Sequence, residues 1–176
     1  MDEIILVDPS IEYEDQIFAF KNEILASGDN DAFAGCGTLR KANNITEWLE
    51  SVEKFNDPIK VPKGYVPSNT YLAIRIIDNR LVGIIDLRHH INHPILSLWG
   101  GHIGYSVRPS ERNKGYGKEM LRLNLINCID KNIHKVMVTC HSENIASESV
   151  IIANGGIFEK EIDVNGSKIK RFWITL

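Results

Sequence analysis

Basic residues and glycines gather in the stretch "SVRPSERNKGYGKEML", residues 106–121, where an apolar strand passes into a helix. A helix N-terminus presents unpaired N–H groups and partial positive charge, so it holds anions well. Gly115 and Gly117 have no Cβ, which lets a phosphate approach the backbone closely. The junction therefore predicts a phosphate site. Three side chains add positive charge at its rim: Arg112, Lys114 and Lys118.

Two familiar phosphate loops do not fit the spacing of these residues. A P-loop needs glycine where Arg112 stands and Ser or Thr where Glu119 stands. A dinucleotide-binding fingerprint needs glycine at Met120. The predicted phosphate therefore belongs to another kind of loop.

The composition bounds the protein class. The chain of 176 residues is 43% hydrophobic and fits one domain over residues 1–176. A net charge of −3 argues against nucleic acid as a partner. No apolar run approaches the length of a membrane span or resembles a secretory signal, so we expect no membrane association. Cys36, Cys128 and Cys140 are too scattered for a disulfide framework, which favours reduced thiols in a cytoplasmic protein.

Hydrophobic periodicity predicts alternating helices and strands. Helices are expected over 10–27, 44–55, 115–131 and 144–155, and strands over 3–7, 70–77, 81–89, 96–107, 135–141, 157–163 and 168–176. The β-α-β piece from 103 to 140 should place two parallel strands side by side through a right-handed crossover. We therefore expect an α/β fold with one mixed, mostly antiparallel sheet and helices on both faces.

The motif Arg112-x-x-Gly115-x-Gly117, placed between a strand and a helix, resembles the pyrophosphate loop of the GNAT superfamily of acyl-CoA N-acyltransferases. The later segment "NIASESVIIANGG" resembles the second cofactor segment of that superfamily, with Asn144 and Ser147 at the matching spacing. The resemblance is specific from about residue 100 to 158 and holds only in outline over 1–68. The same stretches are similar to a bacterial subgroup of predicted acetyltransferases.

This resemblance implies transfer of an acetyl group from acetyl-CoA to an amine by direct attack, with no metal. It implies that the backbone N–H of Val107, at a bulge near the end of its strand, stabilises the charge that develops on the thioester oxygen. The cofactor-binding residues that it implies are Val107, Arg108, Arg112, Asn113, Lys114, Gly115, Tyr116, Gly117, Lys118, Asn144 and Ser147.

The proton donors and acceptors usual in this superfamily are missing. A lysine-like amine has a reference pKa of ~10.4 and must lose a proton before it can attack. The leaving thiolate, whose thiol has a reference pKa of ~8.5, leaves more readily if an acid gives it a proton. The superfamily often places a Tyr as that acid where this chain has Ile151. The strand positions that often carry the base hold Gly101, Ile103, Tyr105 and Thr139, of which only Tyr105 titrates.

Other residues are therefore candidates for proton transfer. Asp86 interrupts an apolar strand and is either a base with a raised pKa or the ion-pair partner of Arg88, two residues on and on the same face. His141 ends a strand and is either an acid or base or an ordinary surface histidine. Three histidines in residues 88–93, "RHHINH", suggest a metal site. Because no carboxylate or cysteine pattern lies nearby, a solvated loop is the plainer interpretation.

The acceptor side should be lined by the loop over 27–40 and the proline-rich stretch up to Val66. Its acids, Asp29, Asp31 and Glu47, either attract a cationic amine or are simply solvated. Two other functions stay open at this stage. One is a non-catalytic acyl-CoA binding or sensing module, and the other is a mononucleotide-binding protein unrelated to CoA. The closing hairpin could pair across a homodimer.

Overall fold

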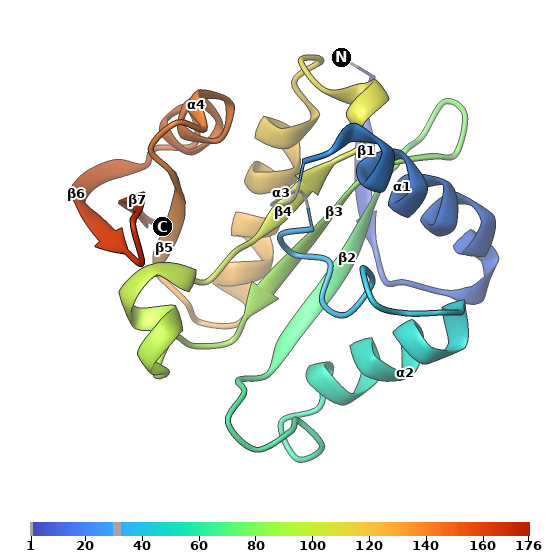
Figure 1. Cartoon of the computed structure of the whole chain (residues 1–176), viewed down its shortest axis with the longest axis horizontal. Coiled ribbons are helices and arrows are strands. Elements are labelled where there is room, and N and C mark those ends of the chain that lie inside the picture. The colour runs from blue at the N-terminus through green and yellow to red at the C-terminus, as the bar shows by residue number, and fades with distance from the viewer. Residues whose placement is uncertain (1, 30–32) are drawn as a thin grey trace.

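The computed structural model describes residues 2–29 and 33–176 (Figure 1). Its strands are β1 (Ile4–Val7), β2 (Ser68–Arg75), β3 (Arg80–Arg88), β4 (Tyr105–Val107), β5 (Lys135–His141), β6 (Ile157–Val164) and β7 (Ser167–Thr175). Its helices are α1 (Glu14–Ser27), α2 (Ile45–Asn56), α3 (Tyr116–Asp130) and α4 (Ile145–Ala153), with short helical turns η1 (Ile11–Tyr13), η2 (Leu96–Gly100) and η3 (Pro109–Glu111).

The strands form two antiparallel sheets. The first has the order β1-β2-β3-β4 and the second the order β5-β7-β6. Helices α1 and α2 pack on one side of the first sheet and α3 packs on the other, as Figure 1 shows. The predicted α/β class with helices on both faces is confirmed. The pairing that we expected between β4 and β5 is not formed, so the single mixed sheet is divided at this point.

His102 explains why the two sheets part. Its backbone N–H donates to the Met137 carbonyl at 2.8 Å, which is the first contact that a parallel ladder would make. The Met137 N–H then donates to Nδ1 of the His102 ring at 2.9 Å, in place of a strand carbonyl. The His102 carbonyl, in turn, accepts the Arg88 N–H of β3 at 2.8 Å, so it does not accept an N–H of β5, and the ladder to β5 ends at this residue.

The expected strand over 96–107 is reduced to β4, and its first part is the π-helical turn η2. Side chains, rather than a neighbouring strand, bind the carbonyls of this segment. Arg88 donates to the Gly100 oxygen at 2.8 Å, and Thr139 donates to the Trp99 oxygen at 2.6 Å. Gly101 has φ +66°, and a Cβ there would lie 2.6 Å from the Met137 oxygen. The close approach to β5 therefore requires a glycine in a conformation that no strand adopts.

Two buried clusters hold the first sheet between its helices. Strand β3 is buried on both faces, with Ile85 and Leu87 packed in the cluster around α3 and Leu81 and Ile84 in the cluster around α1 and α2. This explains why its sequence is a continuous apolar run rather than an alternating one. None of the helices in the described part of the chain has both the length and the apolar character of a membrane span.

Candidate active site

A cavity of about 770 Å³ opens where the two sheets diverge, and we call it the cofactor cavity. Three segments of the chain form most of its wall. Residues 103–107 line it from β4 and the turn before it, residues 111–113 and 115–118 from η3 and the start of α3, and residues within 139–150 from β5 and α4. The glycine-rich loop predicted to bind phosphate is thus part of one continuous cavity with the strand edges.

The start of α3 has the geometry of an anion site. Gly115 precedes the helix with φ +90°, and no side chain caps the first turn. The N–H groups of this first turn have no carbonyl within the helix to bind. Gly117 packs closely, since a Cβ there would lie 3.3 Å from Val150 and 3.4 Å from Val107. The two glycines therefore bring the helix terminus against the cavity wall.

Most of the residues predicted to bind the cofactor line this cavity: Val107, Arg112, Asn113, Gly115, Tyr116, Gly117, Lys118, Asn144 and Ser147. Arg108 and Lys114 do not. The buried Arg108 donates to a Glu23 carboxylate oxygen at 2.6 Å and to the Leu81 carbonyl at 3.3 Å. Lys114 donates to the Ser110 carbonyl at 2.9 Å and to Glu111 at 3.0 Å. Both side chains therefore bind neighbouring protein groups and stabilise the loop from outside the cavity.

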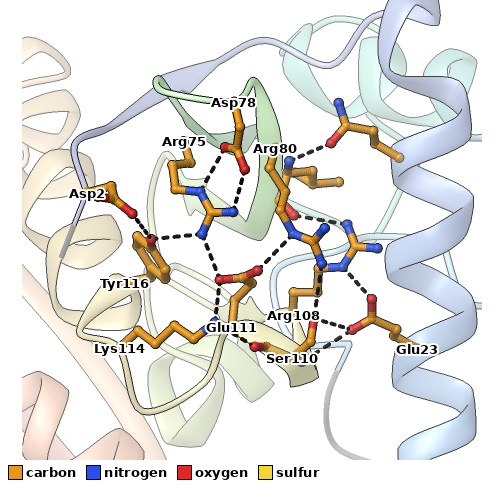
Figure 2. A network of polar contacts seen from close by, with 12 residues as sticks. Asp2, Glu23, Arg75, Asp78, Arg80, Arg108, Ser110, Glu111, Lys114 and Tyr116 are labelled. Carbon is orange, nitrogen blue, oxygen red and sulfur yellow. Dashed lines mark hydrogen bonds and ion pairs between the residues drawn. The ribbon is translucent and has the colours of Figure 1, made fainter.

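Glu111 is the centre of this support (Figure 2). The residue is 4% exposed, and its carboxylate lies 2.9 Å from the Arg75 guanidinium, 2.8 Å from that of Arg80 and 3.0 Å from the Lys114 amine. Burial alone would raise the pKa of Glu111, but the Lys114 hydrogen bond and the charges of Arg75 and Arg80 lower it below its ordinary value. Arg75 also donates to the Tyr116 hydroxyl at 3.1 Å. Through Arg75 and Arg80, the β2–β3 hairpin thus binds and stabilises the loop at the start of α3.

Strand β4 presents one backbone edge to the cavity. Asp86 N–H bonds the Gly104 carbonyl and Arg108 N–H bonds the Val82 carbonyl, which fixes the hydrogen-bonded positions of the β3–β4 pair. Val107 lies between them, opposite Gly83, so its N–H and C=O point away from β3. The register runs evenly through these positions, without the bulge that we expected at Val107. The Val107 N–H nevertheless faces the side on which β4 and β5 diverge.

Tyr105 crosses the cavity to α4. Its hydroxyl lies 2.7 Å from the Ser147 Oγ. Ser147 is itself placed by the helix cap, because its N–H donates to the Asn144 Oδ1 at 3.0 Å. Burial raises the pKa of the Tyr105 phenol above its ordinary value, so the group keeps its proton at neutral pH. The sequence did not predict this contact. It places a phenol next to α4, the helix in which Ile151 is buried.

A second cavity of about 790 Å³ adjoins the first, and we call it the acceptor cavity. Ala34 and Arg88 line both cavities, so the two meet there. Residues from the loop after α1, from α2 and from the segment before β2 form most of its wall, as the sequence predicted for the acceptor side.

Asp86 lies in the acceptor cavity and forms the predicted ion pair with Arg88, at 3.1 Å. Its other oxygen accepts the Gly104 N–H at 2.6 Å. Burial raises the pKa of Asp86, although the Arg88 charge and the Gly104 hydrogen bond act in the opposite direction. The ion pair is therefore confirmed, and it leaves a carboxylate with a raised pKa in the acceptor cavity, beside Arg88, which lines both cavities.

The remaining candidates lie apart from one another. His141 lines the cofactor cavity. Asp29 also lines that cavity and pairs with Arg112 at 3.1 Å, whereas Glu47 caps α2 by accepting the Asn43 N–H at 3.0 Å. Asp31 lies outside the described residues. The loop acids thus do not form a common site among the residues that the structure describes.

The histidines before η2 bind neighbouring groups of the protein. The His89 Nε2 lies 2.7 Å from the Asn69 Oδ1, and the His93 Nε2 lies 3.1 Å from the Gly64 carbonyl. Within residues 2–29 and 33–176, no three side chains of the metal-binding types come together as a ligand set.

Known structures resemble this fold over nearly the whole chain. The microcin C7 self-immunity acetyltransferase MccE, in complex with acetyl-CoA and AMP, superposes with a TM-score of 0.71 at 14% identity over 100% of this chain and 94% of that one. RimL, a ribosomal L7/L12 alpha-N-protein acetyltransferase in complex with coenzyme A, gives 0.66 at 16% identity over 98% and 94%. The spermidine/spermine N-acetyltransferase SpeG from Vibrio cholerae gives 0.63 at 14% identity over 98% and 93%.

A search of curated proteins by sequence finds no match. The family model described as "Acetyltransferase (GNAT) domain" matches residues 29–157. That range includes both the loop at the start of α3 and the whole of α4, two of the segments that line the cofactor cavity. The chain therefore belongs to the GNAT acetyltransferase family.

Proposed function

We propose that this protein is an N-acetyltransferase that transfers the acetyl group of acetyl-CoA to the amine of a small molecule or peptide. One observation carries the proposal: the cofactor cavity extends from the start of α3 to the open edge of β4 and adjoins the acceptor cavity at Ala34 and Arg88. A pyrophosphate at the helix terminus and a thioester beside Val107 would occupy one continuous path.

In the proposed reaction, the amine nitrogen attacks the thioester carbon and the carbon–sulfur bond breaks. The Val107 N–H donates to the carbonyl oxygen as negative charge develops on it, which is the role that oxyanion donors have in acyl transfer. The neutral amine loses one proton and the leaving thiolate gains one, so the overall charge balances. A substrate that binds as an ammonium releases one further proton to solvent before the attack. The products are an amide and free CoA.

The proposed proton acceptor is Asp86, because it combines a raised pKa with a place in the acceptor cavity next to Arg88, which lines both cavities. The proposed proton donor to the thiolate is Tyr105, because burial keeps its phenol protonated and it lines the cofactor cavity. His141 is the alternative residue for either transfer, since it also lines that cavity.

Two measurements on the same sample test this function. Isothermal titration with acetyl-CoA, with ATP and NAD as competitors, tests the cofactor. Release of free CoA, followed with a thiol reagent against a panel of amines, tests the reaction, and mass spectrometry locates the acetyl group. Binding with amine-dependent release supports the proposal, whereas binding without release from any amine favours the acyl-CoA sensor. Tighter binding of ATP than of acetyl-CoA contradicts the cofactor assignment.

A cytoplasmic location and pairing of two chains through the β6–β7 hairpin stay predictions. The three cysteines are buried free thiols, in keeping with a reducing compartment. Size-exclusion chromatography with light scattering tests the dimer.

A further inference from the structure

Thr70 is a buried residue of β2 whose hydroxyl binds no group of the protein. It is 6% exposed and lines the acceptor cavity. Within the described part of the chain, its Oγ takes part in no hydrogen bond. By contrast, the buried Ser106 hydroxyl on the wall of the cofactor cavity donates to the Ala34 carbonyl at 2.8 Å. A buried hydroxyl without a protein partner costs free energy, so the Thr70 hydroxyl points to a molecule bound in the cavity.

The Thr70 oxygen is open to the cavity rather than sealed in the core. Among the described residues that are not exposed, the Nε of Arg80 is the one fully enclosed side-chain nitrogen or oxygen without a hydrogen bond, and it faces the Glu111 carboxylate. The Thr70 Oγ also has no hydrogen bond, but it is not fully enclosed. Because Thr70 lines the acceptor cavity, a ligand there can reach this oxygen.

The register of the sheet places Thr70 beside the proposed base. Thr70 and Asp86 are directly opposite each other in the antiparallel β2–β3 pair, so their side chains share one face with Cβ atoms about 5 Å apart. Both residues line the acceptor cavity. The Asp86 oxygens are bound by the Gly104 N–H and by Arg88. A carboxylate and an open hydroxyl therefore lie side by side on one wall.

The fold itself does not require a hydroxyl at this position. The next pair on the same face, Leu72 opposite Ile84, is fully buried in the cluster around α1 and α2. The face thus changes from apolar to polar at Thr70 and Asp86, where the cavity begins. A valine would continue the apolar face with the same shape, so the hydroxyl is explained by a ligand rather than by packing.

Aromatic side chains line the same cavity and indicate a suitable probe. The rings of Phe55 and Tyr65 meet edge to face with their centroids 5.4 Å apart, and both residues line the cavity, as does Phe33. Pockets of this kind accommodate an apolar body and orient it through a few polar groups. Phenethylamine combines an aromatic body with one amine.

We propose that Thr70 is a substrate-binding residue whose Oγ accepts one N–H of the acceptor amine, while Asp86 takes the proton that the amine loses on attack. The proposal rests on the proposed acetyl transfer and adds a residue to its acceptor site. A neutral primary amine has two N–H groups, one for each of these acceptors, and its lone pair stays free to attack the thioester carbon. The product amide keeps one N–H, which Thr70 still binds.

The variant Thr70→Val removes the hydroxyl and keeps the branched shape. We expect kcat/KM for phenethylamine to fall about tenfold, while KM for acetyl-CoA changes less than about twofold. Thr70→Ser should recover most of the loss, because it restores the hydroxyl. Thr175→Val is the matched control, because Thr175 is an exposed strand residue outside both cavities. An unchanged kcat/KM in Thr70→Val would overturn the proposal.

A stability measurement separates substrate binding from a structural role. Because the Thr70 hydroxyl binds no described protein group, Thr70→Val should leave the urea midpoint of unfolding unchanged or raise it. A lower midpoint together with weaker binding of acetyl-CoA would mean that Thr70 supports the fold, and would overturn the proposal.

A secondary amine tests the division of the two N–H groups. N-methylphenethylamine has a single N–H, which cannot serve both Thr70 and Asp86. Thr70→Val should therefore reduce kcat/KM for this amine much less than for phenethylamine. An equal reduction for the two amines would contradict the hydrogen bond to Thr70.

A binding measurement keeps the test independent of turnover. N-acetylphenethylamine and phenethyl acetate, which has an ester oxygen in place of the amide N–H, are titrated into the protein saturated with CoA. The preference of the wild type for the amide should exceed that of Thr70→Val about fivefold, the worth of one hydrogen bond. An equal preference in the two proteins, or no binding of either compound, overturns the proposal. Failure of acetyl-CoA itself to bind would instead remove the proposed function.

Discussion

The Tyr105 hydroxyl lies 2.7 Å from the Ser147 Oγ, so a phenol on β4 contacts the first turn of α4 across the cofactor cavity. Both residues come from segments that resemble cofactor-binding elements of the family. The contact joins the two walls between which a thioester would lie.

Tyr105→Phe should lower kcat at least about tenfold, because the leaving thiolate loses its proton donor. Affinity for acetyl-CoA should change less than about twofold, because the ring that packs in the cavity is retained. Tyr71→Phe is the matched control, since Tyr71 is on β2 and lines neither cavity. Steady-state kinetics and titration with acetyl-CoA check both values. An unchanged kcat would exclude Tyr105 as the donor.

Lys118→Glu should weaken acetyl-CoA binding about tenfold, because it replaces a cation at the first turn of α3 with an anion beside the expected pyrophosphate. The loss should diminish at high salt, since exposed charges are screened. Lys54→Glu, in the last turn of α2 and outside both cavities, provides the control. Isothermal titration at low and high salt measures the effect. Equal affinities for the two variants would mean that the phosphates bind elsewhere.

Asp86→Asn should lower kcat by about 10² or more while KM for acetyl-CoA stays constant, because the proposed base is lost and the side-chain shape is kept, although one of the two positions that accept from Arg88 and Gly104 becomes a donor. His141→Gln should change kcat less than about threefold if Asp86 is the base. The pH profile gives a second readout. The acidic limb of kcat should disappear in Asp86→Asn, and its persistence there together with its loss in His141→Gln would reverse the assignment.

Glu111→Gln should reduce the free energy of unfolding by about 2 kcal/mol, because three cations then lose a buried counter-charge, although Lys114 is half exposed. Glu119→Gln is the control, because Glu119 pairs with Arg122 at the surface and its loss should cost less than about 1 kcal/mol. Urea unfolding followed by circular dichroism compares the two. Similar losses would show that the Glu111 network is no stronger than a surface pair.

Acid should loosen the junction between the sheets through His102. Burial and the nearby Arg88 charge lower the pKa of His102 to about 4, whereas in the unfolded chain its pKa is near the ordinary value of 6.5. Between these values the unfolded chain binds the proton and the folded protein does not. The contribution of His102 to the free energy of unfolding is therefore fully present above pH 6.5 and is lost as the pH falls toward 4.

The comparison of wild type with His102→Gln isolates this effect, because the glutamine oxygen can still accept the Met137 N–H. Urea unfolding at pH 7, 6 and 5 should show a smaller decline for the variant. His89, whose pKa is also lowered to about 4, contributes equally to both proteins. Parallel declines would contradict the role of His102.

Local signals in the sequence predicted most of the fold. Asn44 caps α2 as predicted, accepting the Glu47 N–H at 2.9 Å. Asn165 and Gly166 both have positive φ, 52° and 85°, as a tight hairpin turn requires. These features depend on residues adjacent in the chain, and for that reason a single sequence reveals them.

The misjudged features depend on contacts between distant residues. The stretch over 96–107 has the composition of a strand, but side chains from other elements bind its carbonyls and form η2. Arg108 and Lys114 belong to the basic loop in sequence, yet acids on α1 and η3 bind them away from the cavity. Glu23 lies 85 residues before Arg108, and no spacing rule connects the two. The pair Lys114–Glu111 is the short-range exception, with Glu111 three residues before Lys114 on a turn, η3, that we did not expect from the sequence.

The divergence at His102 has a consequence for aggregation. An unpaired strand edge invites another chain to add a strand to it, and proteins protect such edges by keeping them short or covered. The open edge of β4 is only three residues long and faces its own second sheet across a cavity. The protein thus keeps an unpaired backbone edge for a small ligand while leaving no room for a foreign strand.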